Sequence, residues 1–109
     1  MDHYLISFPS AWMQLTDEEH PEVVRTSHEA IEEAKAAGAY VFGGGIDESI
    51  EPVVIDGEGA RSPGRTQLDG GFCVIRAATR EEAERWAARI AQGCRTPQEL
   101  RAFMFDPAS

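Results

Sequence analysis

The chain has 109 residues, of which 10 are basic and 19 acidic, so its formal net charge is −9. The length predicts a single domain over residues 1–109. The acidic balance argues against a nucleic-acid partner, because binding to phosphates requires an excess of lysine and arginine. No apolar run approaches the roughly 20 residues that span a bilayer, so we expect no membrane partner either.

The N-terminal segment, residues 2–8, has the alternation typical of a half-buried strand. Tyr4, Ile6 and Phe8 share one face, and the residues between them share the other. Pro9 ends this strand, since proline cannot donate a hydrogen bond to a sheet ladder. The segment therefore predicts the first strand of a sheet with one strongly apolar face.

A long helix is predicted after this strand. Thr16 and Glu19 form a capping box. Pro21 is tolerated only near the start of a helix, so the main helix begins or bends there, and Gly38 ends it. The apolar stripe expected to face the sheet follows the i, i+3, i+4, i+7 pattern. It consists of Val24, Ser27, His28, Ile31, Ala34 and Gly38.

The middle of the chain predicts two more strands and a long loop. Residues 39–43 are apolar at every position, which indicates a strand buried on both faces. The glycines at 43–45 remove all side chains from its end, which permits a bulge or the close approach of a backbone or ligand. Residues 52–55 form the next strand, and the loop over 57–70 contains a short strand at 60–62.

The last third of the chain predicts a strand, a helix and a final strand. The strand covers residues 71–76. Thr79 opens a second capping box, and the helix that it starts runs over about 80–92 and ends at Gly93. The apolar run at 100–105 forms the last strand.

This order of elements predicts an α+β fold. Two helices among four or five strands fit a ferredoxin-like sandwich, with both helices on one face of an antiparallel sheet. Large apolar groups nevertheless occupy both alternations of the strands. They include Tyr4, Ile6, Tyr40, Phe42, Phe72 and Phe103. Because monomers seldom expose so large an apolar patch, we expect a homodimer that pairs the helix-free faces of two sheets.

A family resemblance that covers most of the chain rests on four segments. They are Tyr4–Ile6, a helix end and strand at 36–44, a strand at 68–75 and a helix at 81–87. In this order they resemble the YCII-related family, including its branch named for an Asp-Gly-Pro-Phe motif. That motif itself is absent, and residues 62–65, Ser-Pro-Gly-Arg, stand in its place.

The resemblance implies a ferredoxin-like fold that pairs into a dimeric α/β barrel, with a cavity near the dimer interface. Enzymatic activity is suspected for the family without a general reaction. Its members place a histidine on the first helix and an aspartate after the second strand, and His28 and Asp47 are the nearest candidates here. Such a pair can perform acid–base catalysis, because the carboxylate orients the imidazole. A core-edge histidine and a turn aspartate are the alternative.

Several further residues are candidates for ligand binding. Tyr4, Tyr40 and Phe42 can line an apolar pocket or simply pack at an interface, and Arg65 on the long loop can meet an anionic ligand. The three histidines lack metal-ligand spacing, so we expect neither metal nor cofactor. The two cysteines lie outside any C-x-x-C pair, as in a reduced cytoplasmic protein.

Two functions therefore stay open from the sequence. The first is a small cofactor-independent enzyme that acts on a small organic molecule, with His28 as the base and Asp47 as its orienting partner. The second is a noncatalytic dimeric module that binds a small ligand or another protein. The absence of the Asp-Gly-Pro-Phe motif favours the second.

Overall fold

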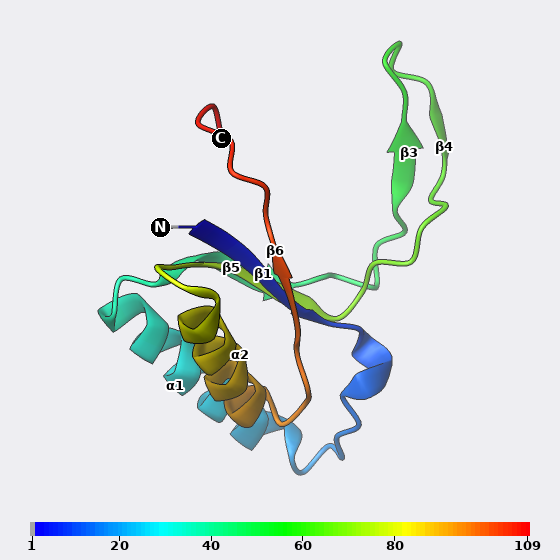
Figure 1. Cartoon of the computed structure of the whole chain (residues 1–109). Helices are drawn as coiled ribbons and strands as arrows, with labels where there is room; N and C mark the ends of the chain where they lie inside the picture. Colours follow the sequence, from blue (N-terminus) through cyan, green and yellow to red (C-terminus); the bar gives the residue numbers. More distant parts are fainter. Residues whose placement is uncertain (1) are drawn as a thin grey trace.

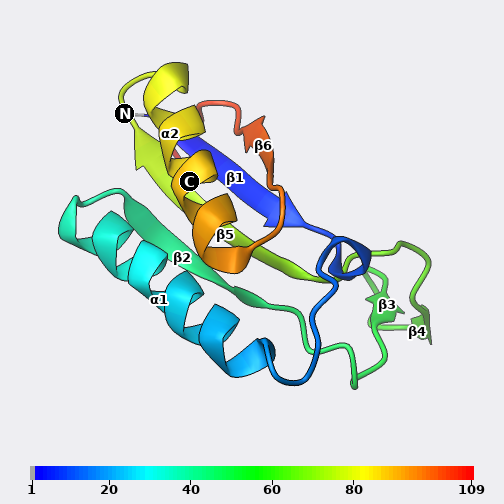
Figure 2. The same cartoon turned by 90° about the horizontal axis from the view of Figure 1, so that it is seen from below.

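The computed structural model describes residues 2–109. Its elements are β1 (Asp2–Phe8), the 3-10 helix η1 (Ser10–Trp12), α1 (His20–Ala36), β2 (Tyr40–Gly45), β3 (Val53–Ile55), β4 (Arg61–Pro63), β5 (Gly71–Ala77), α2 (Arg80–Cys94) and β6 (Glu99–Ala102). Four strands form an antiparallel sheet in the order β2-β5-β1-β6, and β3 pairs with β4 in a separate hairpin. Both helices cover one face of the four-stranded sheet (Figures 1 and 2). This is the ferredoxin-like α+β arrangement that the sequence predicted.

The central strands β1 and β5 supply most of the core beneath the helices. Tyr4 lies opposite Ile75, and Ile6 lies opposite Cys73. All four residues are 5% exposed or less. The alternation predicted for residues 2–8 is thus confirmed, and its apolar face is the face that the helices cover.

The ends of α1 follow from its local sequence. Glu19 donates its N–H to the Thr16 hydroxyl, but this bond closes a turn just before the helix. The helix itself begins at His20, with Pro21 in its first turn as predicted. Gly38 follows the last turn with a φ of +73°, the left-handed conformation that commonly terminates helices.

The buried stripe of α1 differs from the predicted one. Its buried side chains are Val23, Ala30 and Ala34, whereas Val24 is 41% exposed and His28 is exposed. The helix packs against α2 as well as against the sheet. The prediction was therefore wrong at Val24 and His28, because the buried stripe is turned so that Ala30 lies against Gly93 of α2.

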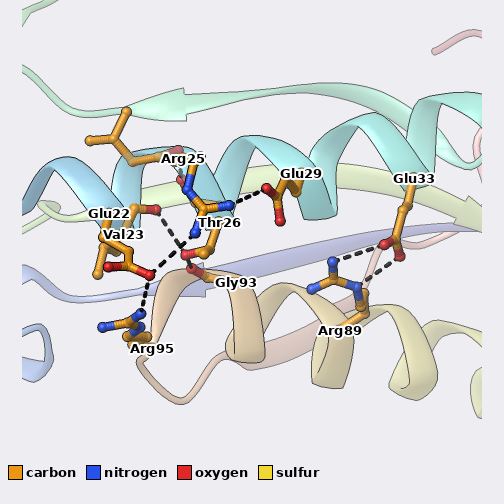
Figure 3. Close-up of polar contacts among 11 residues, drawn as sticks. Glu22, Val23, Arg25, Thr26, Glu29, Glu33, Arg89, Gly93 and Arg95 are labelled. Atoms are coloured by element: carbon orange, nitrogen blue, oxygen red, sulfur yellow. Dashed lines mark hydrogen bonds and ion pairs between the residues drawn. The ribbon is translucent and has the colours of Figure 1, made fainter.

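Gly93 lies inside α2 rather than capping it, so the predicted end of this helix was wrong. The helix continues to Cys94 and ends at Arg95, whose φ is +54°. A β carbon on Gly93 would lie 2.7 Å from the Thr26 carbonyl oxygen and 2.9 Å from the Ala30 β carbon. The glycine is therefore required by the close packing of α2 on α1 (Figure 3).

β2 is an edge strand, so its predicted burial on both faces was wrong. Val41 is 41% exposed and Phe42 is 63% exposed, because one edge of this strand lacks a neighbour and the helices cover one face only. The register shifts between Tyr40 and Phe42. A β carbon on Gly43 would lie 2.5 Å from the Cys73 β carbon, which confirms the close approach predicted for the glycine run.

Two segments project from the side of the sheet opposite the helices (Figure 1). One is the β3–β4 hairpin, which confirms the strands predicted at 52–55 and 60–62 to within a residue. The other is the C-terminal tail, residues 103–109. The last strand was predicted to reach Phe105 but ends at Ala102. No helix lies over this face, so the apolar side chains beyond Ala102 find no core to join.

Candidate functional site

A cavity of about 370 Å³ lies between α1, the glycine end of β2 and the adjoining parts of β5 and α2. Its polar lining consists of Ser27, His28, Lys35, Tyr40 and Gln98. Its apolar lining includes Ile6, Phe8, Ile31, Phe72 and Ile90. The volume falls within the range of small-molecule pockets.

Glycines create much of this space. Residues 43–45 and 70–71, which include five glycines, line the cavity with backbone alone. A β carbon on Gly43 would lie 2.8 Å from the Tyr40 hydroxyl, so a side chain here would displace the tyrosine. By contrast, a β carbon on Gly44 would have no neighbour within 4 Å. Position 43 must therefore be glycine for β2 to pair with β5 while the Tyr40 ring lies beside it.

Lys35 and Tyr40 form one polar wall of the cavity. The Lys35 Nζ lies 3.3 Å from a carboxylate oxygen of Glu32 and 5.5 Å from the centroid of the Tyr40 ring. Burial raises the pKa of the Tyr40 phenol, with a smaller contribution from Cys73. The phenol therefore stays protonated at neutral pH, and this wall presents an ammonium group and a hydroxyl donor.

Both cysteines line the same cavity and are free thiols. Burial raises the pKa of Cys73 to about 12, with a smaller contribution from Cys94. Burial also raises the pKa of Cys94. Because the thiolate is the nucleophilic form, a raised pKa disfavours both groups as nucleophiles at neutral pH.

The predicted catalytic residues lie in different surroundings. His28 is exposed at the rim of the cavity and contributes to its lining. Asp47 is not among the lining residues, and its Oδ1 accepts hydrogen bonds from the Ser49 hydroxyl at 2.6 Å and the Ser49 N–H at 3.0 Å. These bonds lower the pKa of Asp47. Within residues 2–109, no hydrogen bond or ion pair joins His28 to Asp47.

The four predicted ligand-binding residues are also dispersed. Tyr40 lines the cavity. Tyr4 is 5% exposed within the core. Phe42 lies opposite Val74 on the helix-free face, and Arg65 lines a separate hollow at the hairpin. Of these four, the cavity brings only Tyr40 together with His28.

Three polar residues of the cavity were not predicted. Lys35 is the one lysine of the chain, which is the only signal that its sequence offers. Ser27 was assigned to the sheet-facing stripe without a site role. Gln98 lies in the connection between α2 and β6, and no periodicity in the sequence places it near α1.

No protein-family model matches this sequence, and no curated protein matches it significantly. Neither helix described in residues 2–109 combines the length and apolarity needed to cross a membrane. No group of three or more His, Cys, Asp or Glu side chains in this range is arranged to hold a metal ion. The case for function therefore rests on the cavity and on the uncovered sheet face.

Proposed function

We propose that this protein is a homodimeric, YCII-like binding protein for a small organic molecule, which occupies the cavity between α1 and the glycine run. The observation that carries the proposal is the convergence of His28, Lys35 and Tyr40 on a cavity of about 370 Å³. Asp47 is engaged by Ser49 instead. Binding is therefore better supported than catalysis by a His–Asp pair.

The chemistry of the cavity fits an organic anion. Lys35 and Tyr40 offer hydrogen-bond donors, one of them charged, and bonds from charged donors to carboxylates are among the stronger ones. Phe8 and Ile31 offer apolar contact to the body of the ligand. An aromatic or branched carboxylate combines both requirements.

The exposed area of the protomer supports the homodimer. The chain exposes 7762 Å², whereas a compact monomer of 12.0 kDa exposes roughly 6,000 Å². The excess of about 1,800 Å² is larger than the roughly 800 Å² that each partner buries in a standard interface. A second copy seated on the helix-free face would cover Phe42 and its neighbours.

Calorimetric titration with a panel of small carboxylates, beginning with benzoate, tests the ligand proposal. We expect at least one member to bind, and Lys35→Met to weaken its binding about tenfold or more. Arg85→Met is the matched control, because Arg85 is exposed on α2 and does not line the cavity. Equal binding to Lys35→Met and wild type, or no binding by any carboxylate at millimolar concentration, would contradict the proposal.

A cofactor-independent enzyme is the second candidate function. It is favoured by one observation, the position of the His28 imidazole at the cavity that Tyr40 also lines. In that case the histidine would act as a base without a carboxylate partner. Substitutions at His28 and Asp47 separate the two functions.

A further inference from the structure

We propose that the C-terminal residues Phe103–Phe105 of each protomer cross to a second copy and dock in a hollow of its helix-free face. The inference rests on the homodimer proposed above. It adds which segment is exchanged and where it binds.

The tail carries three large apolar side chains into solvent. Phe103 is 49% exposed, Met104 is 92% exposed and Phe105 is 83% exposed. The last bond to the sheet runs from the Phe103 N–H to the His3 carbonyl at 3.0 Å, and the chain then leads away from the sheet (Figure 1). Three consecutive exposed apolar residues are costly in water, and this arrangement is typical of a binding segment.

The tail has ordered local structure beyond these residues. Asp106 closes a turn, since its Oδ1 accepts the Ala108 N–H at 2.8 Å and its carbonyl accepts the Ser109 N–H at 3.1 Å. The end of the tail therefore forms a turn of its own, and a turn that is already formed loses less conformational entropy on docking.

A hollow of about 630 Å³ lies on the same face and extends from Leu5 and Arg101 toward the other end of the strands. Its apolar lining includes Leu5, Leu68 and Phe72. Its polar rim includes Glu99 and Arg101, which form an ion pair with each other. Leu68 is 72% exposed. An apolar centre with a polar rim is the usual composition of a protein–protein interface.

The tail of the same protomer leads away from this hollow. Leu5 and Arg101 line the near side of the hollow, which extends along β1 to Ser7. The chain runs the opposite way from Arg101, past His3, where the Phe103 N–H makes the last bond to the sheet. A twofold axis that runs across the strands exchanges the two ends of the sheet, so that each tail lies over the partner's hollow and the contact forms twice.

The exposed area agrees with such an exchange. The excess of about 1,800 Å² over a compact monomer is more than twice the area that a standard interface takes from each partner. The radius of gyration is 15.6 Å, against about 13 Å for a compact domain of this length. Both differences are expected of a protomer whose projecting segments are covered only in the dimer.

Disulfide trapping between two variants, Met104→Cys and Leu68→Cys, tests the docking. Both are made in a background in which Cys73 and Cys94 are replaced by alanine, so that each chain carries one thiol. Met104 and Leu68 are strongly exposed in the protomer, so neither substitution should disturb its folding. After co-expression and mild copper-catalysed air oxidation, we expect covalent dimers from the pair, in no more than about half of the chains, because random pairing makes only half of the dimers mixed. Each variant alone should stay unlinked.

The other outcomes overturn the inference in recognisable ways. Covalent dimers of Met104→Cys alone would mean that the two tails meet each other. Efficient linking of Ile55→Cys to Leu68→Cys, without linking of Met104→Cys, would mean that the hairpin occupies the hollow. If the wild type elutes as a dimer but the cysteine variants form no link, the docking is refuted and the proposed dimer is not. A monomeric wild type would refute the proposed dimer itself.

Discussion

The Thr26 hydroxyl donates a hydrogen bond of 2.6 Å to the Gly93 carbonyl and so joins α1 directly to the last turn of α2 (Figure 3). The two helix backbones approach closely here because Gly93 has no side chain. α1 also forms one wall of the cavity. The contact between Thr26 and Gly93 therefore fixes the position of the helix on which His28 and Lys35 lie.

Gly93→Ala should destabilise the protein. Alanine gains up to about 1 kcal/mol of helix propensity over glycine, but its β carbon would lie 2.7 Å from the Thr26 carbonyl oxygen, and overpacking of this kind costs about 1–3 kcal/mol. We expect a net loss of about 1 kcal/mol in the free energy of unfolding, measured by urea denaturation. Gly44→Ala, whose β carbon meets nothing within 4 Å, is the control. Unchanged stability of Gly93→Ala would show that the overpacking costs no more than the roughly 1 kcal/mol that alanine gains in helix propensity.

Arg89→Gln should lower stability at neutral pH and lose its effect in acid. The Arg89 guanidinium donates two hydrogen bonds to Glu33, at 2.7 and 2.8 Å, and these hold the pKa of Glu33 below its ordinary value of 4.5. A carboxyl whose pKa is lowered by folding stabilises the protein above its unfolded-state pKa and loses this contribution as the pH falls through the folded-state value. Urea denaturation at pH 7 and at about pH 2.5 measures the difference.

The matched control for this pair is Arg85→Gln on the same helix. Arg85 forms no ion pair within residues 2–109, so its replacement should have little effect at either pH. An Arg89→Gln effect that is equally large in acid would indicate lost packing rather than a lost ion pair.

The sequence predicted those features that depend on neighbouring residues. Thr79 accepts the Glu82 N–H at 3.1 Å, as a capping box requires, and the alternation in β1 assigned Tyr4 and Ile6 to one face. The orientation of α1 was not predictable in the same way. Val23 and Val24 begin two adjacent stripes on this helix, and Gly93, far away in the sequence, lets α2 approach the stripe that holds Ala30.

The candidate cavity was predictable in part. The glycine run predicted open space at the end of β2, because backbone without side chains leaves room, and the cavity lies there. Periodicity could not show that Asp47 folds back onto Ser49 or that Gln98 reaches the cavity. Both facts depend on loop conformation, which residue spacing does not determine.

Phe42→Asp should dissociate the proposed dimer without unfolding the protomer. Phe42 is 63% exposed in the protomer, so aspartate is tolerated there, but in an interface it would bury an unpaired charge. We expect the dimer dissociation constant to rise at least about tenfold, as measured by light scattering on a sizing column, with an unchanged circular dichroism spectrum. Val24→Asp, on the exposed side of α1, is the control. A dimer of Phe42→Asp as tight as wild type would place the interface elsewhere.

The native thiols should react slowly with disulfide reagents until the protein unfolds. Burial raises the pKa of Cys73 to about 12 and also raises that of Cys94, so little thiolate forms at pH 8. We expect both thiols to be titrated at once in denaturant and only slowly in native buffer. Because the unfolded thiol ionises near 9.0, stability should also fall as the pH rises above that value, and Cys73→Ala should reduce this fall. Rapid labelling of the native protein would contradict the burial of both groups.

Asp47→Asn and His28→Gln together distinguish a binding protein from an acid–base enzyme. The Asp47 carboxylate is held by Ser49 and does not line the cavity, so Asp47→Asn should change the affinity for a bound carboxylate less than about twofold. His28 lines the cavity rim, so His28→Gln should weaken binding by a few-fold through a lost contact. An enzyme that used both residues would instead lose turnover in both variants, by about a hundredfold or more, since acid–base groups typically contribute that much. Calorimetry measures the affinity and an assay of product formation measures the turnover, both on the same preparations. If Asp47→Asn abolishes a turnover that wild type shows, the carboxylate must leave Ser49 and reach His28 in the working protein, and the binding function proposed here is incomplete.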